Sequence, residues 1–308
     1  RDARYYIDTH SDSETPPVVT LHRNSGAVID TLVANERLKE TIARYDLSTP
    51  EFFQVRAADD TTSLHGYLLK PDDFDPEKQY PLLMYVYGGP GAQTVTRRWG
   101  GSRFLWHAYL AREHDVLVAS VDNRGTGGRG KAFKSVTYKK LGQIEARDQQ
   151  AAATALKQRS YVDSSRVGIW GWSYGGYMSL MASLAYEGPT VFDVALSVAP
   201  VTHWKLYDTI YTERYMSTPQ ANPDGYRNGA ATTYADRLRA SQDLLLVHGG
   251  MDDNVHLQNS VQMIDALQDA QKQFDFMMYP GYDHSIAGDG RHLHVYRKLT
   301  NFLIEHIQ

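Results

Sequence analysis

The chain has 308 residues, of which 42% are hydrophobic, and a formal net charge of −4 at pH 7. These values are typical of a globular protein large enough to bury a core, and the charge gives no sign of nucleic-acid binding. The absence of cysteine excludes disulfides and thiolate metal sites. No apolar run approaches the roughly 18 residues that a membrane-spanning helix needs. Because the sequence begins with Arg1 rather than methionine, we expect a fragment of a longer chain.

Residues 1–49 differ in pattern from the rest of the chain. Two short β-strands are predicted at 4–10 and 17–22, and residues 28–45 are predicted to be a linker with one helical turn. Two strands alone do not make a stable sheet. We therefore expect this segment to be the last part of a β-domain.

From residue 50 the pattern becomes regular. A hairpin is predicted from the runs 52–56 and 64–69. The runs 82–87, 116–121, 167–170, 194–198, 244–247 and 274–279 are short and nearly continuously apolar, as in strands buried on both faces. Helices are predicted near 104–112, 144–158, 177–186, 255–270 and 293–307. This order predicts an α/β domain, residues 50–308, with a mostly parallel eight-stranded sheet flanked by helices.

A G-x-S-x-G motif, Gly171 to Gly175, stands between a predicted strand and a predicted helix and is followed by Gly176. In this context the serine occupies a strained turn, the nucleophile elbow of the α/β-hydrolase fold, and glycines permit the close approach of strand and helix. The alternative is a serine in an ordinary glycine turn. Strand before and helix after favour Ser173 as a nucleophile.

A serine nucleophile needs a base, and the base needs a group that orients it. In this fold the acid and then the histidine follow the serine, each on a loop after a late strand. Asp252 lies after the strand 244–247 and His284 after the strand 274–279, so we predict these two residues as acid and base. Asp253 is the competing acid, although it would also serve as a helix N-cap. For His284 the alternative is a surface loop histidine.

The oxyanion formed in acyl transfer needs hydrogen-bond donors. The backbone N–H of Tyr174 is one predicted donor, and the second is expected from the glycine-rich loop that begins at Tyr87.

Two further patterns have competing interpretations. Residues 125–130 match the dinucleotide motif G-x-G-x-x-G, but residues 131–135 open no clear apolar helix, and no acidic residue ends a second strand about 20 residues on. We expect a loop that backs the active site. His292 and His294 are predicted to be surface residues rather than metal ligands, because an i, i+2 pair on a helix points to different faces. We expect neither a metal nor a cofactor.

Several strings together resemble the prolyl oligopeptidase family of serine peptidases, and within it the dipeptidyl peptidase branch. They are residues 85–90 (YVYGGP), 122–125 (DNRG), 171–176 (GWSYGG), 211–216 (YTERYM), 248–255 (HGGMDDNV) and 283–284 (DH). The resemblance implies a triad of Ser173, Asp252 and His284, with the Tyr87 hydroxyl donating to the oxyanion beside the Tyr174 N–H. It also implies a proline pocket and a substrate carbonyl contact made by Val201, Trp204, Tyr207, Tyr211, Asn254 and Val255, together with the Tyr174 ring.

The expected activity is release of N-terminal Xaa-Pro or Xaa-Ala dipeptides from peptides whose second residue is proline or alanine. A prolyl tripeptidyl peptidase or oligopeptidase of the same family is the alternative, and a catalytically silent binding homologue is the alternative of another class. The family also carries an N-terminal β-propeller that binds the substrate amine, so residues 1–49 are expected to be its last strands and the linker. The resemblance further implies a periplasmic or secreted protein and a possible homodimer.

Overall fold

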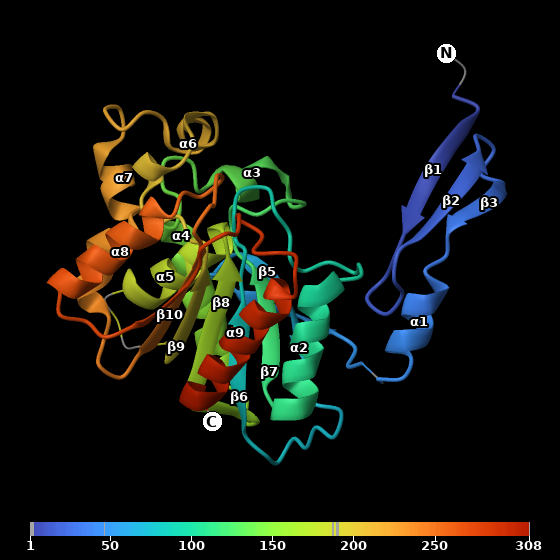
Figure 1. The fold of residues 1–308 in the computed structure, drawn as a ribbon, viewed down its shortest axis with the longest axis horizontal. Coiled ribbons are helices and arrows are strands. Elements are labelled where there is room, and N and C mark those ends of the chain that lie inside the picture. Colours follow the sequence, from blue (N-terminus) through green and yellow to red (C-terminus); the bar gives the residue numbers. More distant parts are fainter. Residues whose placement is uncertain (1–2, 46, 187, 189–190, 308) are drawn as a thin grey trace.

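The computed structural model describes residues 3–45, 47–186, 188 and 191–307. A small N-terminal sheet stands apart from a large α/β domain (Figure 1). The small sheet is antiparallel in the order β1-β2-β3 and consists of β1 (Tyr5–His10), β2 (Val18–Arg23) and β3 (Val28–Val33). Helix α1 (Glu36–Ile42) follows it.

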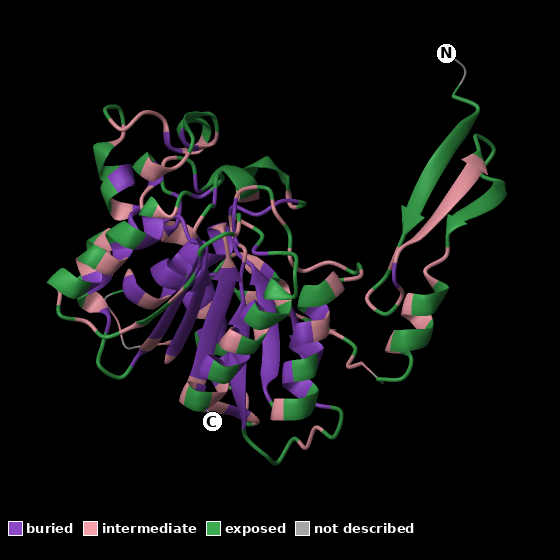
Figure 2. Cartoon of the chain, viewed as in Figure 1, coloured by how far each residue is buried: buried purple, intermediate pink, exposed green. Residues whose placement is uncertain are grey.

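The third strand corrects the prediction of a linker over residues 28–45. A tight turn reverses the chain, in which the N–H of Arg23 donates to the carbonyl of Ala27 at 2.9 Å and Gly26 has a φ of 89°. The predicted helical turn is present as α1. Every residue of β1 and β3 is exposed, so this sheet buries no apolar face against the described chain (Figure 2).

Eight strands of the described chain form the large sheet, in the order β11-β10-β9-β8-β6-β7-β5-β4. Strands β4 and β5 form the predicted antiparallel hairpin, and the strands from β6 onward pair in parallel. The predicted fold is therefore confirmed. The bounds are β4 (Glu51–Arg56), β5 (Ser63–Leu69), β6 (Tyr80–Tyr85), β7 (Leu117–Asp122), β8 (Val162–Trp172), β9 (Val194–Val198), β10 (Asp243–Gly249) and β11 (Asp275–Tyr279).

Helices cover both faces of this sheet, which creates two cores. Because side chains alternate along a strand, Leu82 and Met84 of β6 lie in one core, whereas Leu83 and Tyr85 lie in the other. One core contains α2 (Gly101–His114) and α9 (Arg291–Ile307). The other contains α4 (Gln143–Lys157), α5 (Tyr174–Leu184) and α8 (Gln258–Asp269). Burial is nearly complete along the central strands (Figure 2).

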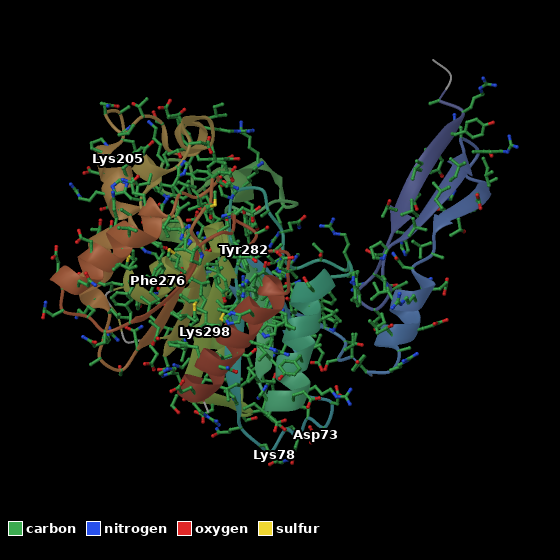
Figure 3. The ribbon with its side chains drawn as sticks, in the orientation of Figure 1. Asp73, Lys78, Lys205, Phe276, Tyr282 and Lys298 are labelled. Carbon is green, nitrogen blue, oxygen red and sulfur yellow. The ribbon has the colours of Figure 1, made fainter. Side chains whose placement is uncertain are left out.

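A group of short helices lies between β9 and β10 in the sequence and was not predicted. It consists of η1 (Trp204–Leu206), α6 (Thr209–Met216), α7 (Pro223–Asn228) and η2 (Ala231–Arg237). A further short helix, α3 (Gly130–Ser135), begins where no clear helix was expected, and it buries no residue. Lys205 of the inserted group lies toward one end of the domain, opposite Asp73 and Lys78 (Figure 3).

The turn from β8 into α5 packs directly on the neighbouring strands. A Cβ atom added to Gly175 would overlap the carbonyl oxygen of Val86, and one added to Gly176 would overlap that of Val198. Both obstacles are backbone atoms, which cannot move aside as a side chain can. Glycine is therefore needed at both positions for α5 to begin where it does.

Replacing Gly175 with alanine should lower the free energy of unfolding by about 1–3 kcal/mol, as overpacking of a closely packed site does. Chemical denaturation measures this change. Gly281→Ala is the matched control, because nothing lies within 4 Å of a Cβ atom at that position. If both variants unfold at the same denaturant concentration as the parent chain, the close contact of Gly175 with the backbone of Val86 is contradicted.

Candidate active site

Ser173 lies at the turn between β8 and α5 with a φ of 62° and a ψ of −121°. A positive φ is strained for a residue other than glycine and persists only where surrounding contacts enforce it. Here the serine N–H donates to the carbonyl of Val198 at 2.8 Å, and its carbonyl accepts from the N–H of Tyr177 at 3.0 Å. The serine is half-buried at the carboxyl end of the sheet. Its conformation matches the nucleophile elbow that the motif predicts.

His284 and Asp252, the predicted base and acid, are hydrogen-bonded to each other. The histidine Nδ1 lies 2.6 Å from the Asp252 Oδ2. Asp252 is buried, whereas Asp253 is exposed. Of the two adjacent aspartates, Asp252 is therefore the one whose carboxylate bonds the histidine in the structure.

Asp252 accepts several other hydrogen bonds. Its Oδ1 accepts from the backbone N–H groups of Asn254 at 3.0 Å and Val255 at 2.8 Å, and its Oδ2 lies 3.3 Å from the Nε2 of His248. Burial by itself raises the pKa of Asp252, but the bonds from His248, His284 and Val255 outweigh burial and hold the pKa below its usual range. The carboxylate therefore stays ionised at neutral pH.

His248 was not identified from the sequence. It is fully buried, and its Nδ1 lies 2.7 Å from the hydroxyl of Ser260. Its only sequence signal is a position four residues before Asp252 in an apolar strand, where a histidine reads as core. A hydrogen bond also links the loop of His284 to the turn that carries Ser173, since the indole N–H of Trp172 donates to the carbonyl of His284 at 2.9 Å. This bond brings the histidine loop against the elbow.

The predicted oxyanion donors lie beside the elbow. Tyr174 is the first residue of α5, where backbone N–H groups have no partner within the helix and point out of its end. The Tyr87 ring lies 5.9 Å from the Tyr174 ring, measured between centroids. Burial raises the pKa of Tyr87, so its phenol remains protonated and able to donate. The loop is held in place by Asn123, whose amide donates to the carbonyl of Gly88 at 3.0 Å.

The loop 125–130, which matches the dinucleotide motif, packs behind the Tyr87 loop. The N–H of Gly127 donates to the carbonyl of Ala92 at 2.9 Å, and that of Gly91 donates to the carbonyl of Gly125 at 3.2 Å. A Cβ atom on Gly127 would overlap the carbonyl oxygen of Gly91. The backbone of the loop 125–130 is thus packed directly against the backbone of the Tyr87 loop.

Aromatic side chains gather next to Ser173. Around the Trp204 ring, the Tyr174 centroid lies at 5.5 Å, the Tyr211 ring is stacked at 6.0 Å, and the Tyr207 ring lies edge-on at 6.2 Å. The Tyr207 hydroxyl donates to Asn254 Oδ1 at 2.8 Å. Val201 and Val255 are buried in the same core. The structure therefore brings together four of the six residues predicted for substrate binding, Trp204, Tyr207, Tyr211 and the exposed Asn254, and it buries Val201 and Val255 in the core to which Trp204 belongs.

Glu145 of α4 is a second residue that the sequence did not reveal. Its side chain is fully buried, and its Oε1 accepts the hydroxyl of Tyr174 at 3.0 Å. Burial raises its pKa to about 7. In the sequence it reads as an acidic residue in the first turn of a helix, a common stabilising position that gives no hint of burial.

His292 and His294 were predicted to be surface residues rather than metal ligands. His294 is exposed and its Nδ1 lies 2.8 Å from the hydroxyl of Tyr279, while the half-buried His292 ring lies 6.0 Å from the Trp172 ring. No group of three or more potential metal ligands occurs among the described residues. Throughout the residues that the structure describes, no helix is long and apolar enough to cross a membrane.

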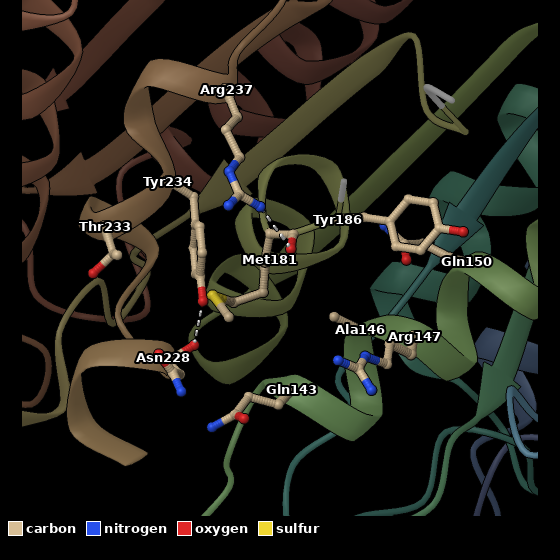
Figure 4. A pocket seen from close by; sticks show the side chains of 11 residues that line it. Gln143, Ala146, Arg147, Gln150, Met181, Tyr186, Asn228, Thr233, Tyr234 and Arg237 are labelled. Carbon is tan, nitrogen blue, oxygen red and sulfur yellow. Dashed lines mark hydrogen bonds between the residues drawn. The ribbon is translucent and has the colours of Figure 1, made fainter. Parts of the chain in front are cut away.

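A separate hollow of about 540 Å³ lies between α4, α5 and η2 (Figure 4). Gln143 and Arg147 line it from α4, and Tyr234 and Arg237 from η2. None of the predicted site residues lines this hollow. We assign it no role in the candidate site.

Comparison with known proteins gives a consistent result. Residues 102–308 match the model of the prolyl oligopeptidase family. The chain is 41% identical over 276 residues to a probable dipeptidyl-aminopeptidase B of Aspergillus terreus, covering 89% of this chain and 29% of that protein. It is 40% identical over 308 residues to the corresponding Aspergillus fumigatus protein, covering 97% of this chain and 32% of that protein.

Solved structures agree. The crystal structure of Porphyromonas gingivalis dipeptidyl peptidase 4 matches 98% of this chain and 42% of its own chain, with 42% identity and a TM-score of 0.92. A putative dipeptidyl aminopeptidase IV from Bacteroides ovatus matches the same shares with 36% identity and a TM-score of 0.88. The chain spans about a third of the length of the curated relatives it matches. By family model, sequence identity and fold, the chain belongs to the prolyl oligopeptidase family.

Proposed function

We propose that this chain is the catalytic domain of a serine peptidase that releases N-terminal Xaa-Pro or Xaa-Ala dipeptides. The observation that carries the proposal is the bonded pair of His284 and Asp252, whose loop is hydrogen-bonded through Trp172 to the turn that holds Ser173 at a positive φ. Membership of the prolyl oligopeptidase family supports the reaction class, and the names of the relatives support the dipeptidyl specificity.

In the proposed reaction, His284 takes the proton of the Ser173 hydroxyl while the serine oxygen attacks the carbonyl carbon of the second substrate residue, which is proline or alanine. Asp252 holds the imidazole in orientation and stabilises its charged form. The histidine then gives the proton to the leaving amine, and an acyl-enzyme remains. Water, activated by the same histidine, hydrolyses that ester and regenerates the serine. The ionised state of Asp252 suits this role, because a neutral acid would not stabilise an imidazolium.

The oxyanion is proposed to accept from the N–H of Tyr174 and the hydroxyl of Tyr87. The proline ring is proposed to lie among Trp204, Tyr207, Tyr211 and the two buried valines, Val201 and Val255. Aromatic faces suit a flat apolar pyrrolidine. Asn254 would donate to the carbonyl of the preceding residue. Its exposure leaves the amide accessible to a ligand, and its bond from Tyr207 fixes its orientation.

The proposed division places residues 1–49 in the last strands and linker of an N-terminal β-propeller, and residues 50–308 in the catalytic domain. Two observations support it: the small sheet buries no apolar face against the described chain, and the chain covers only a fraction of each relative. A homodimer and a periplasmic or secreted location belong to the same proposal and rest on family membership.

The alternatives are less well supported. A tripeptidyl peptidase or oligopeptidase would use the same triad, but the matching relatives are named dipeptidyl peptidases. A silent binding homologue would lack a triad member, whereas all three are present and two of them are hydrogen-bonded.

Ser173→Ala should abolish turnover of an Xaa-Pro chromogenic substrate, because loss of a triad member costs on the order of 10⁴ to 10⁶ in rate. It should also abolish labelling by a reagent specific for active-site serines. Thermal unfolding serves as the folding control. Retention of a tenth of the parent activity would show that Ser173 is not the nucleophile.

The neighbouring aspartates provide a matched pair. Asp252→Asn should lower kcat by roughly 10⁴, because the amide favours the wrong tautomer of the histidine. Asp253→Asn makes the same chemical change on an exposed side chain and should leave kcat within about twofold. Steady-state kinetics at pH 8 distinguish them. A larger loss in the Asp253 variant would reverse the assignment of the acid.

The isolated chain should not distinguish substrates with a free amine from those with a blocked amine. If the groups that bind the substrate amine belong to the propeller, the 308-residue chain should hydrolyse an Xaa-Pro substrate and its N-acetylated form with similar kcat/KM. Two charge-assisted contacts are worth about 1.5–3 kcal/mol each, so their presence would give a preference of at least about 10²-fold for the free amine. Such a preference would place an amine site within this chain.

A further inference from the structure

Glu145 is buried behind the aromatic cluster and touches a residue that the proposed mechanism uses. Its Oε1 accepts the hydroxyl of Tyr174 at 3.0 Å, and the side chain has no exposed surface. Tyr174 supplies the proposed oxyanion N–H from its backbone and a wall of the proline pocket from its ring. A hydrogen bond to its hydroxyl therefore restrains the ring of the same residue whose backbone N–H is proposed to bind the oxyanion.

A second tyrosine makes the same kind of contact one turn later. The hydroxyl of Tyr177 donates to the carbonyls of Leu141, just before α4, at 3.0 Å and of Gly229 at 2.7 Å. The indole N–H of Trp204 in turn donates to this hydroxyl at 3.1 Å. Residues three apart lie on one face of a helix, so α5 rests two phenols on the start of α4. Of these acceptors, only the Glu145 side chain can change its charge.

The carboxyl of Glu145 is incompletely paired. Its Oε2 is buried and has no hydrogen-bond partner among the described residues. The nearby cation, Arg124, is occupied by Asp148 at 2.7 Å and by Asp59 at 2.6 Å. No ion pair within the described chain involves Glu145. Burial without a cation disfavours the charged form of a carboxyl and so raises its pKa.

Titratable and charged groups on four elements interact electrostatically with this carboxyl. They are Asp148 on α4, Tyr174 and Tyr177 on α5, Tyr211 on α6, and Arg124 after β7. Burial is the main cause that raises the pKa of Glu145, and Asp148 raises it further. The backbone N–H groups of Glu145 and Gly142 and the Tyr174 hydroxyl oppose that rise, which leaves the pKa at about 7.

We propose that Glu145 is a positioning residue for the proline pocket and oxyanion site, which holds Tyr174 through its hydroxyl and holds it more firmly when the carboxyl is ionised. This inference rests on the proposed peptidase function. Its physical basis is that hydrogen bonds to charged acceptors are stronger than those to neutral ones. The effect on Tyr174 reaches the substrate through the ring and the helix start, without contact between Glu145 and the substrate.

Glu145→Gln isolates the charge, because the amide oxygen still accepts the phenol but never ionises. The measured quantity is the ratio of kcat/KM for the parent chain to that for the variant on an Xaa-Pro substrate, from about pH 5.5 to about pH 8.5. Any pH dependence that the parent chain and the variant share cancels in this ratio. We expect a ratio near 1 at the acid end, rising about fivefold with a midpoint near 7, from the roughly 1 kcal/mol by which charged acceptors exceed neutral ones. Glu305→Gln, an exposed site on α9, should give a ratio of 1 throughout.

Two measurements without substrate separate this inference from the proposed function. Ionising the buried carboxyl is unfavourable in the folded state, so the parent chain should lose thermal stability relative to Glu145→Gln as the pH rises from 4.5, the ordinary pKa of a glutamate, to about 7. The Trp204 indole N–H signal in a nitrogen-15 spectrum should shift over the same range in the parent chain and not in the variant, since this ring lies 5.5 Å from Tyr174.

A chain that hydrolyses no Xaa-Pro substrate overturns the proposed function, and the indole titration then decides the positioning role alone. A kcat/KM ratio that stays flat with pH overturns the positioning role in an active enzyme. An indole signal that titrates equally in Glu145→Gln overturns it in an inactive one. A rising ratio together with an indole shift confined to the parent chain supports it.

Discussion

The contact between the start of α5 and the backbone of β6 and β9 is the constraint on which the site depends. Glycines at 175 and 176 allow this helix to begin against the carbonyls of Val86 and Val198, with no side chain between them. The chain must then turn sharply at Ser173, which takes a positive φ. The same geometry points the first N–H of the helix outward and directs Tyr174 toward α4. The proposed nucleophile, oxyanion donor and pocket wall thus all depend on this one close approach of helix and strands.

The pKa values of two buried carboxyl groups in this region are shifted in opposite directions. Asp252 receives donors from two histidines and two backbone N–H groups, so its charge is stabilised. Glu145 receives one phenol and backbone donors but no cation, so burial prevails and its charge is not fixed at neutral pH. The same side-chain chemistry therefore gives a permanent charge beside the base and a variable one behind the aromatic cluster.

The sequence predicts what local pattern determines and misses what distant contacts determine. The central strands are apolar because helices cover both faces, and each appears where the runs predict it. Strand β3 was missed because its apolar residues stand in two adjacent pairs around Asp30 and Thr31, without the alternation that is typical of a half-buried strand. Helices α6 and α7 were missed because tertiary contacts hold them: Met216 and Tyr226 are buried in the core, and the Tyr226 hydroxyl donates to the carbonyl of Ser217.

Site residues divide in the same way. Ser173 is found by its motif, and His284 by its place after the last strand. The choice between Asp252 and Asp253 cannot be made from adjacent positions, because which of two neighbours faces the histidine depends on the turn that follows β10. In the structure that turn buries the first and exposes the second. Glu145 carries no sequence signal because its partner, Tyr174, is 29 residues away on another helix.

The proposed catalytic residues and the proposed pocket residues come from different parts of the fold. Ser173, Asp252 and His284 follow β8, β10 and β11, strands that belong to the sheet itself. Trp204, Tyr207 and Tyr211 come instead from the group of short helices inserted between β9 and β10. An insertion can change in length and sequence without disturbing the register of the sheet, because its ends alone are fixed by the strands. The fold therefore allows the proposed pocket to diverge while the proposed triad stays in place, and Tyr174, which follows Ser173 and packs against Trp204, is the residue that touches both.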